Sequence, residues 1–173
     1  YDRLKPMQFY HGLEPRVAFR YLIKPDFSIK AAFNRNFQYL QIASNSSAGL
    51  PIDRWILADR YTRPIQSDQL SLGLFKNFQQ NRWEFSLEGY YKDLKNVIDL
   101  RNGAQVLFTD QVETEILSGA GWSYGVEALL RKNTGKTTGW LSYTWSRAWR
   151  RIDGVSLGNA YNPRFDRPHD VSL

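Results

Sequence analysis

Hydrophobic and polar residues alternate with a period of two along most of the chain. Val17 begins a series of large apolar side chains at every second position, and Arg16 and Arg20 have the opposite parity. Because side chains point alternately to the two faces of a β-strand, this pattern predicts a strand with one apolar and one polar face. The same alternation recurs in six further runs, at residues 27–34, 69–74, 83–91, 122–130, 139–146 and 169–173.

One of these runs also contains a competing signal. Residues 126–132, VEALLRK, are good helix formers. Their alternation nevertheless stays in phase with that of residues 122–125, so we expect a strand here too. The sequence therefore predicts about seven antiparallel strands and an all-β fold.

The connections between the predicted strands alternate strictly between short and long. KPD (24–26), KNFQQNR (76–82) and KNTGK (132–136) join strands in pairs. The long stretches between the pairs cover residues 35–68, 92–121 and 147–169. A soluble sandwich gives no reason for this alternation, whereas a transmembrane barrel has short periplasmic turns and longer extracellular loops. The connections favour an antiparallel up-and-down transmembrane β-barrel.

The two predicted faces differ in chemistry as a transmembrane barrel requires. We expect these side chains to face lipid: Val17, Phe19, Tyr21, Leu70, Leu72, Leu74, Phe85, Leu87, Tyr124, Val126, Leu141 and Tyr143. We expect these to face the lumen: Arg16, Arg20, Lys30, Glu84, Glu88, Glu127 and Arg131. Charges of both signs cannot form a dry core without partners, but they suit a wet barrel interior.

Composition narrows the class further. Among 173 residues, 42% are hydrophobic and 15% aromatic, yet the mean hydropathy is −0.51. No apolar run approaches the ~18 residues of a membrane-spanning helix, and the absence of cysteine excludes thiolate metal sites and cysteine nucleophiles.

The opening YDRLKPMQFY resembles neither a signal peptide nor a natural start. Seven strands would leave open edges in lipid, so we expect residues 1–173 to be one partial barrel domain.

Several ordered motifs resemble the barrel of TonB-dependent outer-membrane receptors. They are GLPIDRW (49–55), RPIQSDQLSLGLFKNF (63–78), EFSLEGYYKDLKNVID (84–99), GAGWSYGVEALLRKNTGKTTGWLSYTWSRAWR (119–150) and FDRPHDVSL (165–173). The resemblance covers nearly the whole chain. It is strongest to the branch whose full chains carry a carboxypeptidase-regulatory-like domain ahead of the plug.

The resemblance implies a location and a function. Such receptors enclose an N-terminal plug in a barrel of about 22 strands. They import a scarce nutrient, such as a siderophore, oligosaccharide or peptide, with energy delivered through TonB. The implied location is the bacterial outer membrane. The implied partners are outer-membrane lipid and lipopolysaccharide, the remaining barrel and plug, the TonB system and a surface lipoprotein. The resemblance implies no nucleic-acid partner, no cofactor, no metal and no catalytic activity. Residues 1–173 contain no recognisable plug, TonB box or signal peptide.

The first long connection contains the candidate ligand-binding residues. Charged and aromatic side chains are mixed there, as sugar, peptide or metal-chelate binding would require: Asp53, Arg54, Trp55, Tyr61 and Arg63. Any packed extracellular loop has a similar composition, so a structural role is an equal alternative for these residues.

Other motifs have simpler explanations. GWSYG (121–125), followed by Asp166 and His169, matches a hydrolase pattern, but its serine lies inside an alternating run and not at a strand-to-helix elbow. TGKTT (134–138) lacks the leading glycine of a P-loop, and a hairpin turn with Gly135 at positive φ explains it better. His11 and His169 have no neighbouring carboxylates or thiols at metal-ligand spacing.

The net charge of +6 comes from basic residues scattered along the chain, which disfavours a nucleic-acid interface. Two alternatives to the receptor remain open. One is a structural or complex-forming outer-membrane barrel of a secretion or surface assembly. The other is a soluble antiparallel β-protein that binds carbohydrate or nucleic acid.

Overall fold

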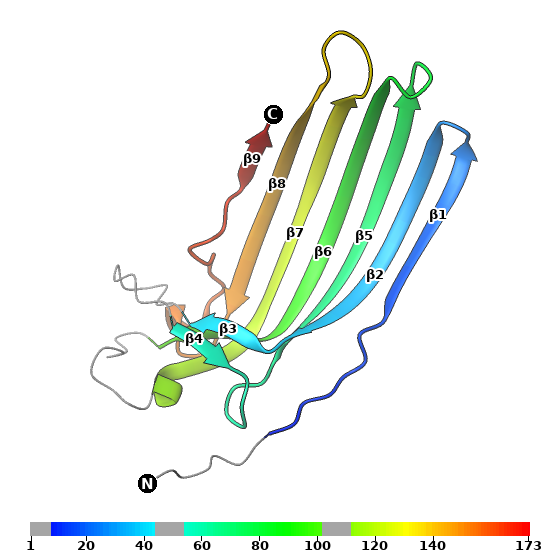
Figure 1. The fold of residues 1–173 in the computed structure, drawn as a ribbon. Helices are drawn as coiled ribbons and strands as arrows, with labels where there is room; N and C mark the ends of the chain where they lie inside the picture. Colours follow the sequence, from blue (N-terminus) through cyan, green and yellow to red (C-terminus); the bar gives the residue numbers. More distant parts are fainter. Residues whose placement is uncertain (1–7, 44–53, 102–111) are drawn as a thin grey trace.

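The computed structural model describes residues 8–43, 54–101 and 112–173 (Figure 1). Within these ranges the chain is built from β-strands, with two single-turn 3₁₀ helices. The strands are β1 (Arg16–Lys24), β2 (Phe27–Gln38), β3 (Leu40–Ala43), β4 (Arg54–Leu57), β5 (Ile65–Phe78), β6 (Trp83–Leu100), β7 (Ile116–Lys132), β8 (Gly139–Arg151) and β9 (His169–Ser172). The 3₁₀ helices are η1 (Val112–Glu115) and η2 (Ser156–Gly158).

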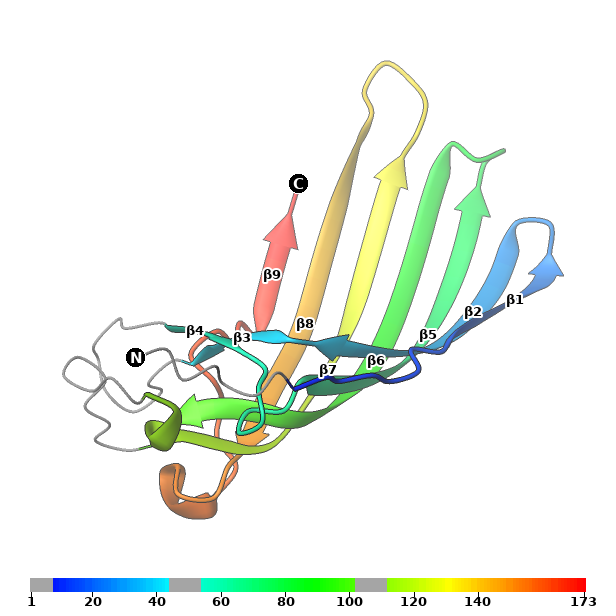
Figure 2. The same cartoon turned by 60° about the horizontal axis from the view of Figure 1, so that its bottom comes forward.

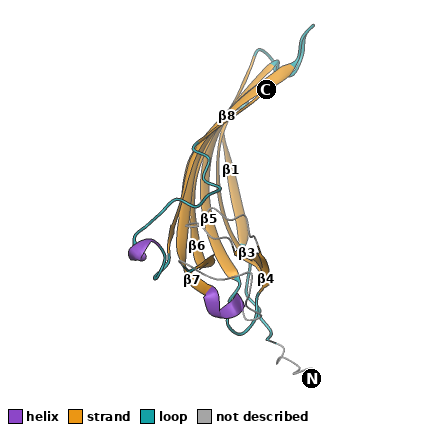
Figure 3. Ribbon diagram, turned by 90° about the vertical axis from the view of Figure 1, so that its left-hand side faces the viewer, coloured by secondary structure: helices purple, strands orange, loops and turns teal. Residues whose placement is uncertain are grey.

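Seven strands form one antiparallel sheet in the order β1-β2-β5-β6-β7-β8-β9. Seen nearly edge-on, the sheet is a single curved layer (Figure 3). The predicted all-β antiparallel fold and its seven strands are therefore confirmed. The helix formers of residues 126–132 lie in β7, which continues without a break to Lys132.

The strands extend further than the hydrophobic alternation does. β6 runs to Leu100, whereas the alternation ends near Tyr91, and β7 begins at Ile116. The long stretches predicted at 35–68, 92–121 and 147–169 are thus partly strand, and the connections shrink to residues 39–64, 101–115 and 152–168. The first of them also contains a two-stranded ribbon of β3 and β4 that the alternation does not predict.

Short and long connections lie at opposite ends of the sheet (Figures 1 and 2). We call these the turn end and the loop end. At the turn end, Gln79, Gln80 and Asn81 have φ between 49° and 67° and reverse the chain between β5 and β6. Gly135 has a φ of 122° in the β7–β8 turn, as predicted.

The strand register places the two predicted sets of side chains on opposite faces. One cross-strand row consists of Phe19, Ala31, Leu72, Gly89, Val126, Trp145 and His169. The next row consists of Arg20, Lys30, Gly73, Glu88, Glu127, Thr144 and Asp170. We call the face of the first row the apolar face and that of the second the polar face. All twelve predicted lipid-facing residues have the parity of the apolar face, and all seven predicted lumen-facing residues that of the polar face.

Nothing in the described chain covers the apolar face. Phe19 is 72% exposed, Leu72 58% and Val126 42%. The buried hydrophobic residues lie instead at the loop end: Ala43, Val97, Ile98, Leu100, Ile152 and Val155. The sheet therefore has no central core of its own, and the packed part of the described chain is the loop end.

Candidate ligand-binding site

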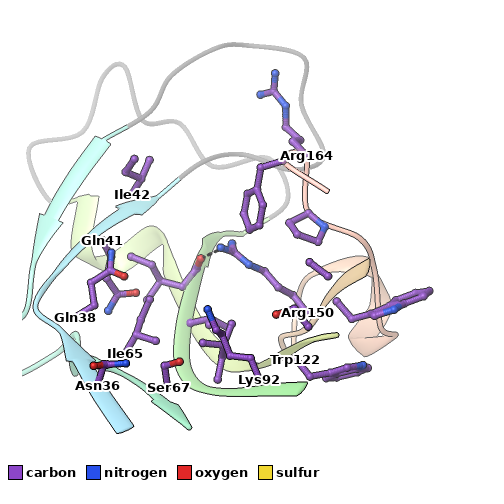
Figure 4. Close-up of a pocket in the computed structure, with 18 residues that line it drawn as sticks. Asn36, Gln38, Gln41, Ile42, Ile65, Ser67, Lys92, Trp122, Arg150 and Arg164 are labelled. Atoms are coloured by element: carbon purple, nitrogen blue, oxygen red, sulfur yellow. Dashed lines mark hydrogen bonds between the residues drawn. The ribbon is translucent and has the colours of Figure 1, made fainter. Parts of the chain in front are cut away.

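The loop end contains a cavity of about 840 Å³ on the polar side of the sheet (Figure 4). Strands β2, β3, β5, β6, β7 and β8 and the β8–β9 connection contribute its walls. The lining residues are Asn36, Gln38, Gln41, Ile42, Ile65, Ser67, Lys92, Leu94, Val97, Ile98, Trp122, Ser123, Ala148, Trp149, Arg150, Pro163, Arg164 and Phe165. Its size is that of a small-molecule site.

The charged residues of the cavity wall are all basic. Lys92, Arg150 and Arg164 line it, and none of the eighteen lining residues is acidic. The other lining residues have amide, hydroxyl, apolar or aromatic side chains. Because Arg150 is paired with Asp99, the net positive charge of the wall comes from Lys92 and Arg164, and this charge favours an anionic occupant.

Gln41 carries an unsatisfied acceptor in this wall. The residue is 1% exposed, and its Nε2 donates a hydrogen bond of 2.9 Å to the carbonyl oxygen of Arg63. Its Oε1 is buried and has no hydrogen-bond partner among the described residues. Buried carbonyl groups rarely stay unpaired, so this oxygen calls for a donor.

Arg150 is held by groups from two other segments. Its Nη1 donates a hydrogen bond of 3.0 Å to the carbonyl oxygen of Ile98 and lies 3.8 Å from Oδ2 of the fully buried Asp99. The hydroxyl of Tyr161 donates a 2.6 Å hydrogen bond to the same carboxylate. Burial, and then the bond to Asp99, raise the pKa of the Tyr161 phenol well above its usual value. The phenol is therefore neutral and available as a donor at ordinary pH.

A β-bulge brings these groups into position. Asn96 has a left-handed φ of 61°, and the β6–β7 register shifts between Lys95 and Val97. The shift brings Val97 opposite Gly119, so that Val97 and Asp99 lie on the polar side. Val97 packs there with Ile152 and Val155, which closes the β8–β9 connection against β6.

Three of the five residues predicted to bind ligand have described side chains, and these three, Trp55, Tyr61 and Arg63, do not line this cavity. Asp53 is outside the described residues, as is the side chain of Arg54. Trp55 and Tyr61 are 65% and 66% exposed, and Arg63 touches the site only through the carbonyl group that accepts from Gln41. The first long connection thus contributes Gln41 and Ile42 to the wall. The distribution of charge and aromatic residues gave no sign of this pair.

Six of the seven predicted lumen-facing residues lie nearer the turn end than the cavity, whereas Arg16 shares the cross-strand row of Lys92. Arg20 Nε donates to Ser28 Oγ at 3.2 Å, and the ammonium of Lys30 lies 4.0 Å from the centre of the Phe75 ring. Glu88 and Glu127 are direct cross-strand neighbours, while Glu84 lies opposite Arg131. This surface therefore carries charges of both signs, whereas the cavity wall carries one.

The residues of the hydrolase pattern are not arranged as a triad. Ser123 lies within the extended strand β7. Asp166 accepts from the backbone N–H of Ala148 at 2.8 Å and pairs with Arg147 at 3.5 Å. His169 Nδ1 is 2.8 Å from the hydroxyl of Tyr143, on the apolar side of the sheet. Each group thus has a different partner and none activates the serine.

Comparison with known protein families identifies the family to which the chain belongs. The family described as TonB dependent receptor-like, beta-barrel matches residues 3–170. No curated protein and no solved structure matches the chain. Among the described residues, no helix is long and apolar enough to cross a membrane. The matching family consists of outer-membrane proteins of Gram-negative bacteria. The matched range, together with the antiparallel two-faced sheet, shows that the chain belongs to the TonB-dependent receptor β-barrel family.

Proposed function

We propose that this chain forms part of the barrel wall of a receptor that imports a scarce nutrient with energy delivered through TonB. The observation that carries the proposal is the division of one sheet into an apolar and a polar face, with the long connections and the cavity at one end. A ligand would meet the loop end first and pass along the polar face. No step in this function requires catalysis by the chain.

The apolar face is proposed to contact hydrocarbon. On β5, its positions are Leu70, Leu72, Leu74, Lys76 and Phe78, a span close to the ~9 to 11 tilted residues that a membrane strand needs. Lys76 lies near the turn end of this span and is paired with Asp26 of the β1–β2 turn. The bidentate ion pair of Arg35 and Asp68, with distances of 2.6 and 2.9 Å, lies on the same face beyond Leu70, toward the loop end. At the turn end, Lys132 lies 5.6 Å from the Trp83 ring centre. Charges thus flank the apolar band at both ends, as headgroup regions would require.

The polar face is proposed to face the water and plug inside the barrel. A charged side chain in the lipid midplane would cost ~2 to 4 kcal/mol, and this face carries several. Residues 1–173 are then one section of the barrel domain, with β1 and β9 pairing with further strands of the same receptor. The plug, the TonB system, lipopolysaccharide and a surface lipoprotein are the partners that this assignment proposes.

The experiment compares nutrient use by strains that lack either the full-length receptor or TonB. We expect at least one nutrient whose uptake at low concentration is lost in both strains and restored by the receptor only when TonB is present. A strain that lacks the receptor but keeps uptake of every nutrient, and instead loses a secreted or surface-assembled protein, would contradict the proposal. That result would favour a structural barrel component.

A further inference from the structure

We infer that the loop-end cavity binds an anionic saccharide, a small molecule that combines a negative charge with several hydroxyl groups. This inference rests on the proposed function, because it names the chemical class of the ligand that would enter the receptor. Three observations support it: a cationic wall, an unpaired buried acceptor and an apolar surface beside them.

The first observation is the isolation of Lys92 from acidic groups. Its cross-strand row on the polar face contains the neutral residues Asn34, Gln69, Ser123 and Ala148 and, on the edge strand β1, Arg16, so it includes no carboxylate. The adjacent rows, Asn36 to Arg150 on one side and Ala32 to Ser146 on the other, also contain no carboxylate. An ammonium group with no acidic neighbours retains its full attraction for an anion.

Two carboxylates that contact residues of β8, Asp99 and Asp166, are already paired. Asp99 lies against Arg150 and Tyr161, and Asp166 lies against Arg147. These pairs neutralise Asp99 and Asp166, so neither repels an anion from Lys92 or Arg164. Arg164 is exposed at the rim of the cavity, where it extends the cationic surface toward the loop end (Figure 4).

The second observation is Gln41 Oε1. This oxygen belongs to a residue that is only 1% exposed, and it lacks a donor among the described residues. An anion without hydrogen, such as sulfate or chloride, offers acceptors only and leaves it unpaired, whereas a hydroxyl group can donate to it. An occupant that carries both an anionic group and a hydroxyl group therefore satisfies Lys92 and Gln41 together.

The third observation is the apolar part of the wall. Ile42 and Ile65 are among the lining residues. Phe165 also lines the cavity, and its ring centre lies 5.1 Å from the guanidinium carbon of Arg150. Such surfaces pack against the C–H faces of a sugar ring while the polar groups bind its edges. A volume of about 840 Å³ accommodates a short oligosaccharide.

The test measures binding to the purified full-length receptor by titration calorimetry. The probes are trigalacturonate, glucose 6-phosphate, neutral maltotriose and the unhydroxylated tricarboxylate tricarballylate. The first two differ in the source of their charge, carboxylate or phosphate. We expect at least one of them to bind more than tenfold tighter than maltotriose and tricarballylate.

Three variants locate the binding. Lys92→Gln should weaken the anionic saccharide at least tenfold, and Gln41→Met should weaken it while leaving tricarballylate unchanged. Lys30→Gln is the matched control, because Lys30 lies on the same face two rows nearer the turn end and outside the cavity. It should bind like the unaltered receptor. Heat-dependent gel mobility verifies that each variant forms a folded barrel.

Equal binding of charged and neutral saccharides, or equal losses in Lys92→Gln and Lys30→Gln, would overturn the inference. If the receptor then still supports TonB-dependent uptake of a neutral nutrient, only the ligand class is wrong. If no nutrient depends on the receptor and TonB together, the proposed function fails as well.

Discussion

At the scale of single residues, the loop end depends on a charge network that joins distant parts of the chain. The fold brings the guanidinium of Arg150 to the carbonyl group of Ile98, which lies 52 residues earlier in the sequence. Tyr161 likewise reaches Asp99 across 62 residues. Because Asp99 is fully buried, its charge depends on these partners.

We therefore predict that Arg150→Met loosens the β8–β9 connection. The change leaves the Asp99 carboxylate buried without its guanidinium, at a cost of about 3 kcal/mol. Hydrogen exchange of residues 152–162 should become markedly faster. Arg151→Met is the control, since Arg151 is the neighbouring arginine and is exposed. Unchanged exchange in Arg150→Met, or the same acceleration in both variants, would show that the network does not hold the connection.

The position of these residues at the cavity could not be predicted from the sequence alone. The parity of Lys92 and Arg150 on the polar face follows from alternation, but their position at a cavity depends on register and on the bulge at Asn96. Gln41 lies in the unpredicted ribbon of β3 and β4, and only the packing of that ribbon buries its side chain. Local patterns contain no information on such long-range contacts.

At the scale of elements, the strands extend beyond the residues in which hydrophobic and polar side chains alternate. Residues 65–68 and 92–96 belong to strands although polar side chains occupy both parities, as Asp68 and Asp93 do on the apolar side. Beyond the apolar band both faces meet water, so the alternation disappears while the backbone hydrogen bonds continue. The predicted strands were short for this reason. In β7 the alternation prevailed over helix propensity because tertiary pairing outweighs it.

The pairing of β7 and β8 depends on the absence of a side chain at Gly125. A Cβ atom there would lie 2.7 Å from the backbone oxygen of Trp145 and 3.0 Å from the Tyr90 ring. We predict that Gly125→Ala destabilises the folded barrel by roughly 1–3 kcal/mol through overpacking. A lower midpoint of heat-induced unfolding, measured by gel mobility, checks this.

Gly89 supplies the matched control on the neighbouring strand. A Cβ atom at Gly89 would meet only the oxygen of Gly125, at 3.8 Å, which is ordinary contact. Gly89→Ala should therefore unfold at the same temperature as the unaltered receptor. Equal midpoints for Gly125→Ala and Gly89→Ala would mean that the close approach of β7 and β8 is not a constraint.

At the scale of the whole molecule, the account depends on the two faces of one curved sheet meeting different surroundings. The sheet has large exposed side chains such as Phe19 and Leu72 on one side and Arg20 and Glu127 on the other. In water, an apolar surface of this extent would be a liability, but in a bilayer it is the side that lipid covers. The all-β class, the seven strands of the main sheet and the division of side chains between its two faces could be predicted from the sequence because they are periodic. The cavity could not, because its walls come from six strands and a connection that only the folded chain brings together.

The most direct measurement is the accessibility of spin labels on adjacent residues of β5. Residues 1–173 contain no cysteine, so Leu72→Cys and Ser71→Cys give defined labelling sites in a full-length receptor free of other cysteines. In lipid bilayers, the account predicts that the label at position 72 collides mainly with oxygen, which concentrates in hydrocarbon. The label at position 71 should collide mainly with a water-soluble nickel complex. Equal access of the nickel complex to both labels, or the reverse pattern, would contradict the account.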